Sequence, residues 1–294
     1  MRYLDPKNDL TFKKIFGEHP HLLKSFLNAV MPFEHGEQIV SLEYLPAELV
    51  PEIPVFKNSI VDVRCIDNHD RQFIVEMQML WTDSFKSRVL FNASKAYVKQ
   101  IGRGIQYKGL QPVYSLNLVN ENFDTKPDTF LHHYKIVHTQ DSEDIIEGLE
   151  FVFIELPKFK SKNFSDKKLE VLWLRFLSEI EDNQESISPD FEMFAETKEA
   201  TDLIRESGFT KAELETYDKY WDYVSTEKTI KADSIDHGKK IGLEEGKLLG
   251  KMEGRMEEKH EVAKNLLRVG VSIDLIIKAT GLSETEIKKL IPSA

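Results

Sequence analysis

Residues 59–80, with the sequence SIVDVRCIDNHDRQFIVEMQML, constrain the fold more than any other stretch of the chain. Two runs in which apolar and polar residues alternate, Ser59–Ile66 and Arg71–Leu80, flank the polar segment Asp67–Asp70. A period of two is typical of β-strands with one buried face, and Asp and Asn favour tight turns. The stretch therefore predicts a β-hairpin.

The alternation also predicts which side chains share a face, because successive residues of a strand point to opposite sides. Asp62 falls on one face with Glu76 and Gln78, and Cys65 falls on the opposite face, where we expect the core. If the hairpin closes symmetrically about His69, Asp62 pairs directly with Glu76. The Cβ atoms of such a pair lie ~5 Å apart.

Two acids opposed in this way repel each other unless a cation lies between them. Mg²⁺ is normally held by one or two carboxylates together with waters and substrate phosphates, which is what this hairpin offers. A solvated hairpin face with scattered polar residues is the alternative, although Ile60, Ile74 and Leu80 make the face mostly apolar. The spacing alone leaves both interpretations open.

A helix is predicted from Asp83 to about Arg103, and it contains five basic residues and one acid. Arg88, Lys95 and Lys99 are spaced by seven and four, so they lie on one side of the helix. Such a row next to two acids suits phosphate groups that arrive at a metal ion. An ordinary solvated helix face is the alternative.

The remaining elements surround this centre. Asp9 is predicted to cap a helix that carries Phe12, Ile15 and Phe16. The other elements that the patterns predict are a helix over Pro20–Val30, an internal strand over Val113–Val119, strands over His132–His138 and Phe151–Leu156, a helix over Asp166–Glu181, and helical segments over Phe191–Ser207 and onward to Val224. His132 and His133 are neighbours on a strand and point to opposite faces, which argues against a histidine metal cluster.

Glycine recurs at every fourth residue near the C-terminus, at Gly238, Gly242, Gly246, Gly250 and Gly254. Each glycine destabilises a helix by about 1 kcal/mol relative to alanine. The segment is therefore a weak helix, a helix that another backbone approaches closely, or an expanded repeat in a linker. Two short helices follow, with Ser272 and Ser283 as N-cap residues, the latter in a capping box with Glu286. This is a helix-turn-helix outline, but its acidic second helix favours docking or dimerisation over DNA reading.

Composition bounds the remaining possibilities. The chain has 294 residues, a formal net charge of -11 and one cysteine, so any contact with a polyanion must come from a local basic patch. The absence of an N-terminal apolar core and of a long apolar run leads us to expect a cytoplasmic protein without membrane contact. We expect two domains, residues 1–235 with a helical subdomain from about residue 165, and residues 236–294.

The order of these elements resembles the PD-(D/E)XK nuclease superfamily, and more narrowly the Rpn family of recombination-promoting nucleases, also labelled transposases. The motifs that carry the resemblance are YLDPKNDLTFKKIFG, IVDVRC, IVEMQ, RVLFNASKAYVKQIGRGIQY and the ending ATGLSETEIKKL, so it covers nearly the whole chain. It implies a restriction-endonuclease-like α/β fold, with a mixed central sheet flanked by helices and a helical C-terminal extension.

The resemblance also implies DNA cleavage that depends on Mg²⁺ or Mn²⁺, with Asp62 and Glu76 as metal ligands. Gln78 stands where the superfamily usually has lysine. As a catalytic residue it is expected to orient water or a ligand by hydrogen bonds, and Lys95 or Arg88 is expected to supply the missing positive charge. Asp9 is either a further polar member of the site or only a helix cap.

We therefore predict a metal-dependent DNA endonuclease with a role in recombination, mobile elements or defence. The C-terminal segment, residues 236–294, is expected to form homodimers or to dock partners. The alternative is a non-catalytic DNA-binding or regulatory protein on an inactive nuclease scaffold.

Overall fold

The computed structural model of the chain describes residues 2–33, 37–49, 59, 60, 62–101, 106–160 and 168–290. Contacts within the chain divide it into two compact units, residues 1–225 and 226–294. Within the described residues, no helix combines the length and the apolar character that a membrane span requires.

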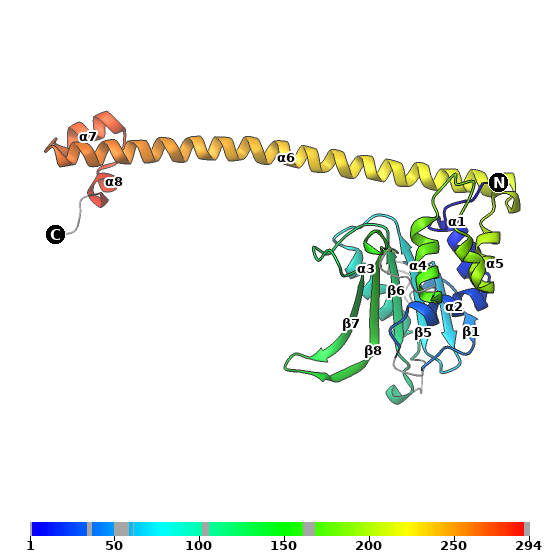
Figure 1. Cartoon of the computed structure of the whole chain (residues 1–294). Coiled ribbons are helices and arrows are strands. Elements are labelled where there is room, and N and C mark those ends of the chain that lie inside the picture. Colours follow the sequence, from blue (N-terminus) through cyan, green and yellow to red (C-terminus); the bar gives the residue numbers. More distant parts are fainter. Residues whose placement is uncertain are drawn as a thin grey trace. The chain divides into compact units, whose positions relative to one another are not determined.

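A mixed six-stranded sheet forms the centre of the first unit (Figure 1). In spatial order its strands are β1 (Leu42–Tyr44), β4 (Val63–Asp67), β5 (Gln72–Gln78), β6 (Val113–Val119), β8 (Asp141–Glu155) and β7 (Leu131–His138). β5, β6 and β8 run parallel, and the other neighbouring strands are antiparallel. β2 (Glu48–Leu49) and β3 (Ser59–Ile60) form a separate antiparallel pair.

Helices flank this sheet, which confirms the predicted α/β class. They are α1 (Asp9–Phe12), a π-helical turn (Lys13–Gly17), α2 (Pro20–Val30), α3 (Phe85–Val98), α4 (Leu169–Glu179) and α5 (Ala195–Leu203). The helix α6 (Lys211–Arg268) begins in the first unit and continues into the second. Short 3₁₀ turns span Tyr107–Gly109, Leu156–Lys158, Pro189–Met193 and Glu206–Gly208. The predicted helical stretch Phe191–Ser207 is thus α5 between two 3₁₀ turns, and the predicted strand Phe151–Leu156 is the last part of the longer β8.

The predicted hairpin and its register are confirmed by β4 and β5, because Val63 pairs with Val75 and Cys65 pairs with Phe73. The predicted first strand is interrupted, however. Residues 59 and 60 pair with β2, and Asp62 lies in a bend before β4. At this bend the Asp62 carboxylate accepts the Met77 N–H of β5 at 2.6 Å.

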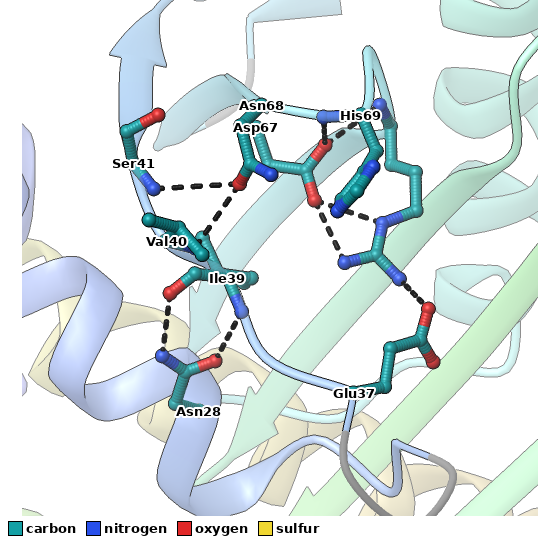
Figure 2. A network of polar contacts seen from close by, with 9 residues as sticks. Asn28, Glu37, Ile39, Val40, Ser41, Asp67, Asn68 and His69 are labelled. Carbon is teal, nitrogen blue, oxygen red and sulfur yellow. Dashed lines mark hydrogen bonds and ion pairs between the residues drawn. The ribbon is translucent and has the colours of Figure 1, made fainter.

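The turn of this hairpin is held by the carboxylate of Asp67. It accepts hydrogen bonds from the backbone N–H groups of His69 and Arg71, each at 2.9 Å (Figure 2). The Arg71 guanidinium closes the turn by pairing with Asp67 at 2.8 Å and with Glu37. Asp70 adopts a left-handed φ of 60°, which Asp tolerates in tight turns. The predicted turn chemistry is therefore present.

The two faces of the sheet pack against different helices. On one face, Cys65, Phe73 and Val75 join the largest apolar cluster, which includes Phe16 and Trp173 from the flanking helical layer. Burying an aromatic side chain of this kind contributes roughly 1.5–3 kcal/mol. These contacts confirm the expected position of Cys65 in the core.

The opposite face is covered by α3. Phe85 and Val89 of α3 pack on Val119 and Phe153, and the helix continues through Ala93 and Ala96 over Ile74 and Val113. This packing places α3 directly over the face that carries Glu76.

The repeated glycines lie inside α6, which is one continuous helix of 58 residues. A Cβ added at Gly238, Gly242, Gly246, Gly250 or Gly254 would meet nothing within 4 Å. The helix interpretation of this segment is therefore correct, and no close approach within the described chain requires these glycines.

The second unit holds two short helices beside the end of α6. α7 (Ile273–Thr280) and α8 (Glu284–Lys289) form one apolar cluster with Ala263, to which Ile276, Ile287 and Leu282 from the turn between the two helices contribute. The capping box of Ser283 and Glu286 is confirmed. Gly281 ends α7 with a left-handed φ of 69°, a conformation that L-residues rarely adopt.

Candidate active site

Glu76 lies near the carboxyl end of β5, and α3 contacts both of its carboxylate oxygens. The Asn92 Nδ2 donates to Glu76 Oε1 at 2.9 Å, and the Arg88 guanidinium lies 3.6 Å from Oε2. Burial raises the pKa of Glu76, whereas the hydrogen bond from Asn92 and the charge of Arg88 act in the opposite direction. The chain therefore buries an acid and supplies it with one neutral and one cationic partner.

Asp62, which lies directly before β4, is also a carboxylate removed in part from solvent. Its pKa is raised from 3.8 to about 7, chiefly by burial; the hydrogen bond from the Met77 N–H acts in the opposite direction, and the negative charge of Glu76 adds to the rise. The two carboxylates therefore interact electrostatically across the hairpin. A buried acid and a partly buried acid that repel each other form a site that favours a proton or a cation.

Both ends of the Gln78 side-chain amide have partners in the chain. Its Nε2 donates to the backbone oxygen of Leu80 at 2.5 Å, and its Oε1 accepts from the Arg88 guanidinium. Gln78 therefore holds the cation that also faces Glu76. Of the two basic residues expected to compensate for the missing lysine, Arg88 is the one that lies against the acid.

Lys95 lies on α3 about two turns after Arg88, and Lys99, the C-cap residue of the helix, follows about one turn later. The Lys95 Nζ lies 5.1 Å from the centroid of the Phe91 ring. Desolvation and the charge of Lys99 both lower the pKa of Lys95. The two ammonium groups are thus close enough to repel each other, and an anion between them would relieve that repulsion.

Asp9 is not the helix cap that the sequence predicts. Asn8 takes that position, because its side chain accepts the N–H of Leu10. Asp9 is the first helical residue and pairs with Lys13 at 2.7 Å. Its negative charge raises the pKa of Asp62, so Asp9 of the opening helix is close enough to interact electrostatically with Asp62.

Comparisons with known proteins show to which family the chain belongs. Residues 6–233 match the model described as PD-(D/E)XK nuclease family transposase. The chain belongs to this family. Residues 256–292 match the Rpn/YhgA-like nuclease family C-terminal HTH domain, which confirms the helix-turn-helix outline. No curated protein and no solved structure gives a match.

The PD-(D/E)XK match and the mixed sheet together support a restriction-endonuclease-like fold, a nuclease-type function and DNA as the partner. The predicted resemblance is thereby confirmed for nearly the whole chain. The boundary at residue 235 stays a prediction, as do the roles assigned to single residues of the site.

The residues at the site fit a divalent ion. Among the described residues, no group of three or more His, Cys, Asp and Glu side chains gathers as a metal cage. Mg²⁺ needs only one or two protein carboxylates, and Asp62 and Glu76 provide two. Asn92 presents a buried side-chain oxygen beside Glu76 that accepts no hydrogen bond from the described residues. This donor set, hard oxygens with one unused acceptor, suits a hydrated Mg²⁺ or Mn²⁺.

Sequence reasoning missed three residues around the site, Asn92, Lys13 and Tyr220. Asn92 follows Arg88 by four residues, and this spacing on a predicted helix could have indicated a shared contact. Lys13 comes from the opening helix, and its charge lowers the pKa of Asp62. Tyr220 comes from α6. Burial raises its pKa first, and the charges of Asp62 and Asp9 raise it further, so its phenol lies near both. No local pattern reveals such a distant contribution.

Proposed function

We propose that the chain is a divalent-metal-dependent DNA endonuclease. The observation that carries this proposal is the acid pair of the partly buried Asp62 and the buried Glu76, with the cationic Arg88 against Glu76. Asp62 and Glu76 would hold Mg²⁺ or Mn²⁺. When bound, the ion lowers the pKa of a coordinated water and neutralises charge on the phosphate.

The side chains of α3 have separate parts in this proposal. Lys95 and Lys99 bind backbone phosphates and align the strand with the site. Arg88, held by Gln78, donates to the phosphate as negative charge develops in the transition state, which a preorganised cation stabilises strongly. Gln78 acts here through Arg88, in place of the superfamily lysine.

A plasmid-nicking assay with Mg²⁺ or Mn²⁺ tests this function. Wild-type protein should relax supercoiled DNA, and Asp62→Asn should reduce the rate at least a hundredfold. Asp202→Asn, which changes an exposed acid paired with Arg205, is the matched control and should cleave like the wild type. Equal residual cleavage by wild type and Asp62→Asn would contradict the proposal and favour a non-catalytic DNA-binding role.

We further propose that α6 forms the homodimer expected from the sequence. Ile241, Leu248, Met252 and Met256 are exposed and spaced by seven, four and four residues, so they share one side of the helix. A second copy offers the same apolar stripe and would cover it. A dimer presents two sites, one for each DNA strand. Cytoplasmic location and a part in recombination, mobile-element movement or defence complete the proposal.

Sedimentation of two matched variants tests the dimer. Leu248→Glu places a charge in the stripe and should give monomers at micromolar concentration. Leu243→Glu makes the same change on the opposite side of α6, where Leu243 is also exposed, and should leave the dimer intact. Identical masses for both variants would contradict an interface along this stripe.

A further inference from the structure

Asn92 lies on α3 one turn after Arg88, and α3 packs on the face of the sheet that carries Glu76. Only 2% of its surface is exposed. Its Nδ2 donates to Glu76 Oε1 at 2.9 Å, so α3 holds one oxygen of Glu76 through Asn92 and approaches the other through Arg88. Asn92 therefore fixes how the Glu76 carboxylate is turned.

The chemistry of Glu76 decides the orientation of the Asn92 amide. An ionised carboxylate can only accept hydrogen bonds, so Asn92 must present its NH₂ group to Glu76 and its oxygen elsewhere. That Oδ1 is buried and accepts no hydrogen bond from the residues that the structure describes. Buried acceptors without a donor are uncommon and destabilising in folded proteins. The Asn92 oxygen is thus ready for a donor that the described chain does not supply.

We propose that Asn92 is a positioning residue for the metal centre, a role that rests on the proposed function. Its Nδ2 holds Glu76 in the orientation that binds the divalent ion. Its Oδ1 accepts a hydrogen bond from a water in the coordination shell of that ion. Mg²⁺ normally keeps several of its waters in proteins, so such a donor is available when the ion is bound.

Two substitutions remove both functions of the amide. Asn92→Leu keeps a similar volume without polar atoms, and Asn92→Ala is a smaller change in case leucine disturbs folding. The full-length protein is titrated with Mg²⁺ and with Mn²⁺ in the absence of DNA, by calorimetry. Partners of metal-bound carboxylates typically change metal affinity by 10–100-fold. We therefore expect the dissociation constant to rise by about 10–100-fold in both variants, and the shift of the unfolding temperature produced by saturating metal to shrink.

Asn28→Leu is the matched control. The Asn28 amide makes two hydrogen bonds away from the acid pair, since it donates to Ile39 O at 2.9 Å and accepts from Ile39 N at 2.8 Å (Figure 2). Its loss should lower the unfolding temperature and leave metal affinity at the wild-type value. A purely structural role for Asn92 would give the same pattern.

Asp62→Asn separates this inference from the proposed function. One outcome is that the wild-type protein binds the ion, Asp62→Asn does not bind it, and the Asn92 variants bind it like the wild type. In that case the proposed role of Asn92 is wrong and the proposed metal site is supported. If the wild type binds no divalent ion, both proposals fail. If the Asn92 variants lose affinity and Asn28→Leu does not, the role of Asn92 is supported.

Discussion

Replacing Asp62 by asparagine should stabilise the metal-free protein at neutral and alkaline pH. Burial raises the pKa of Asp62 from 3.8 to about 7. Between these two values the native state binds a proton that the unfolded chain releases, so the stability of the wild type falls as pH rises. The amide that replaces the carboxylate carries no charge, and its oxygen can still accept the Met77 N–H.

The magnitude follows from the pKa difference. Each pKa unit corresponds to about 1.4 kcal/mol, so about three units give a ceiling of about 4 kcal/mol above pH 7. The difference between variant and wild type should be near zero below pH 4, grow through the interval, and level off above pH 7.

Urea denaturation in the presence of EDTA, from pH 4 to pH 8.5, measures this difference. Asp202→Asn serves again as the control, because its partly exposed ion pair with Arg205 should change stability by less than about 1 kcal/mol. A difference between Asp62→Asn and wild type that does not vary with pH would refute the claim that a buried, ionised Asp62 destabilises the fold.

Three further outcomes follow from particular contacts. Arg88→Met should slow single-turnover cleavage by roughly a hundredfold. The double variant Arg88→Met with Gln78→Lys should recover at least part of that rate, because a lysine at position 78 restores a cation beside Glu76. Lys95→Gln and Lys99→Gln should each weaken DNA binding for all sequences and reduce the salt dependence of the binding constant by about one unit in filter-binding measurements. Gly250→Ala should raise helix stability by about 1 kcal/mol, whereas Gly281→Ala should lower the unfolding temperature, since of these two glycines only Gly281 has a left-handed φ.

The sequence predicts the pairing of the hairpin strands but not the position of Asp62. The alternation of apolar and polar residues predicted the pairing of β4 with β5, because a shift by one residue would move Cys65 and Phe73 out of the core. The same alternation could not show that Asp62 leaves the ladder. At the bend, the Asp62 side chain accepts a hydrogen bond from the Met77 N–H of β5, and a contact with the neighbouring strand leaves no local sequence pattern.

The long helix α6 shows a different limit. Five glycines each lower helix propensity, and a linker was a reasonable hypothesis for that composition. A continuous helix is compatible with this composition because no residue of the segment removes a backbone donor as proline would. The cap at Asn8 was missed for a related reason. Asn and Asp are both good caps, and the choice between adjacent residues depends on the backbone angles of Asn8.

The buried acids connect stability with the proposed function. In the metal-free protein, Asp62 and Glu76 are desolvated and repel each other, so both lower the stability of the fold at neutral pH. A divalent ion bound between the two carboxylates would attract both of them. The electrostatic repulsion that destabilises the metal-free fold would then be removed, which favours binding of the ion. Arg88 offsets only part of this, because its side chain is half-exposed and shared with Gln78. If Asp62 and Glu76 hold the ion as proposed, metal should raise the unfolding temperature of wild-type protein more than that of Asp62→Asn.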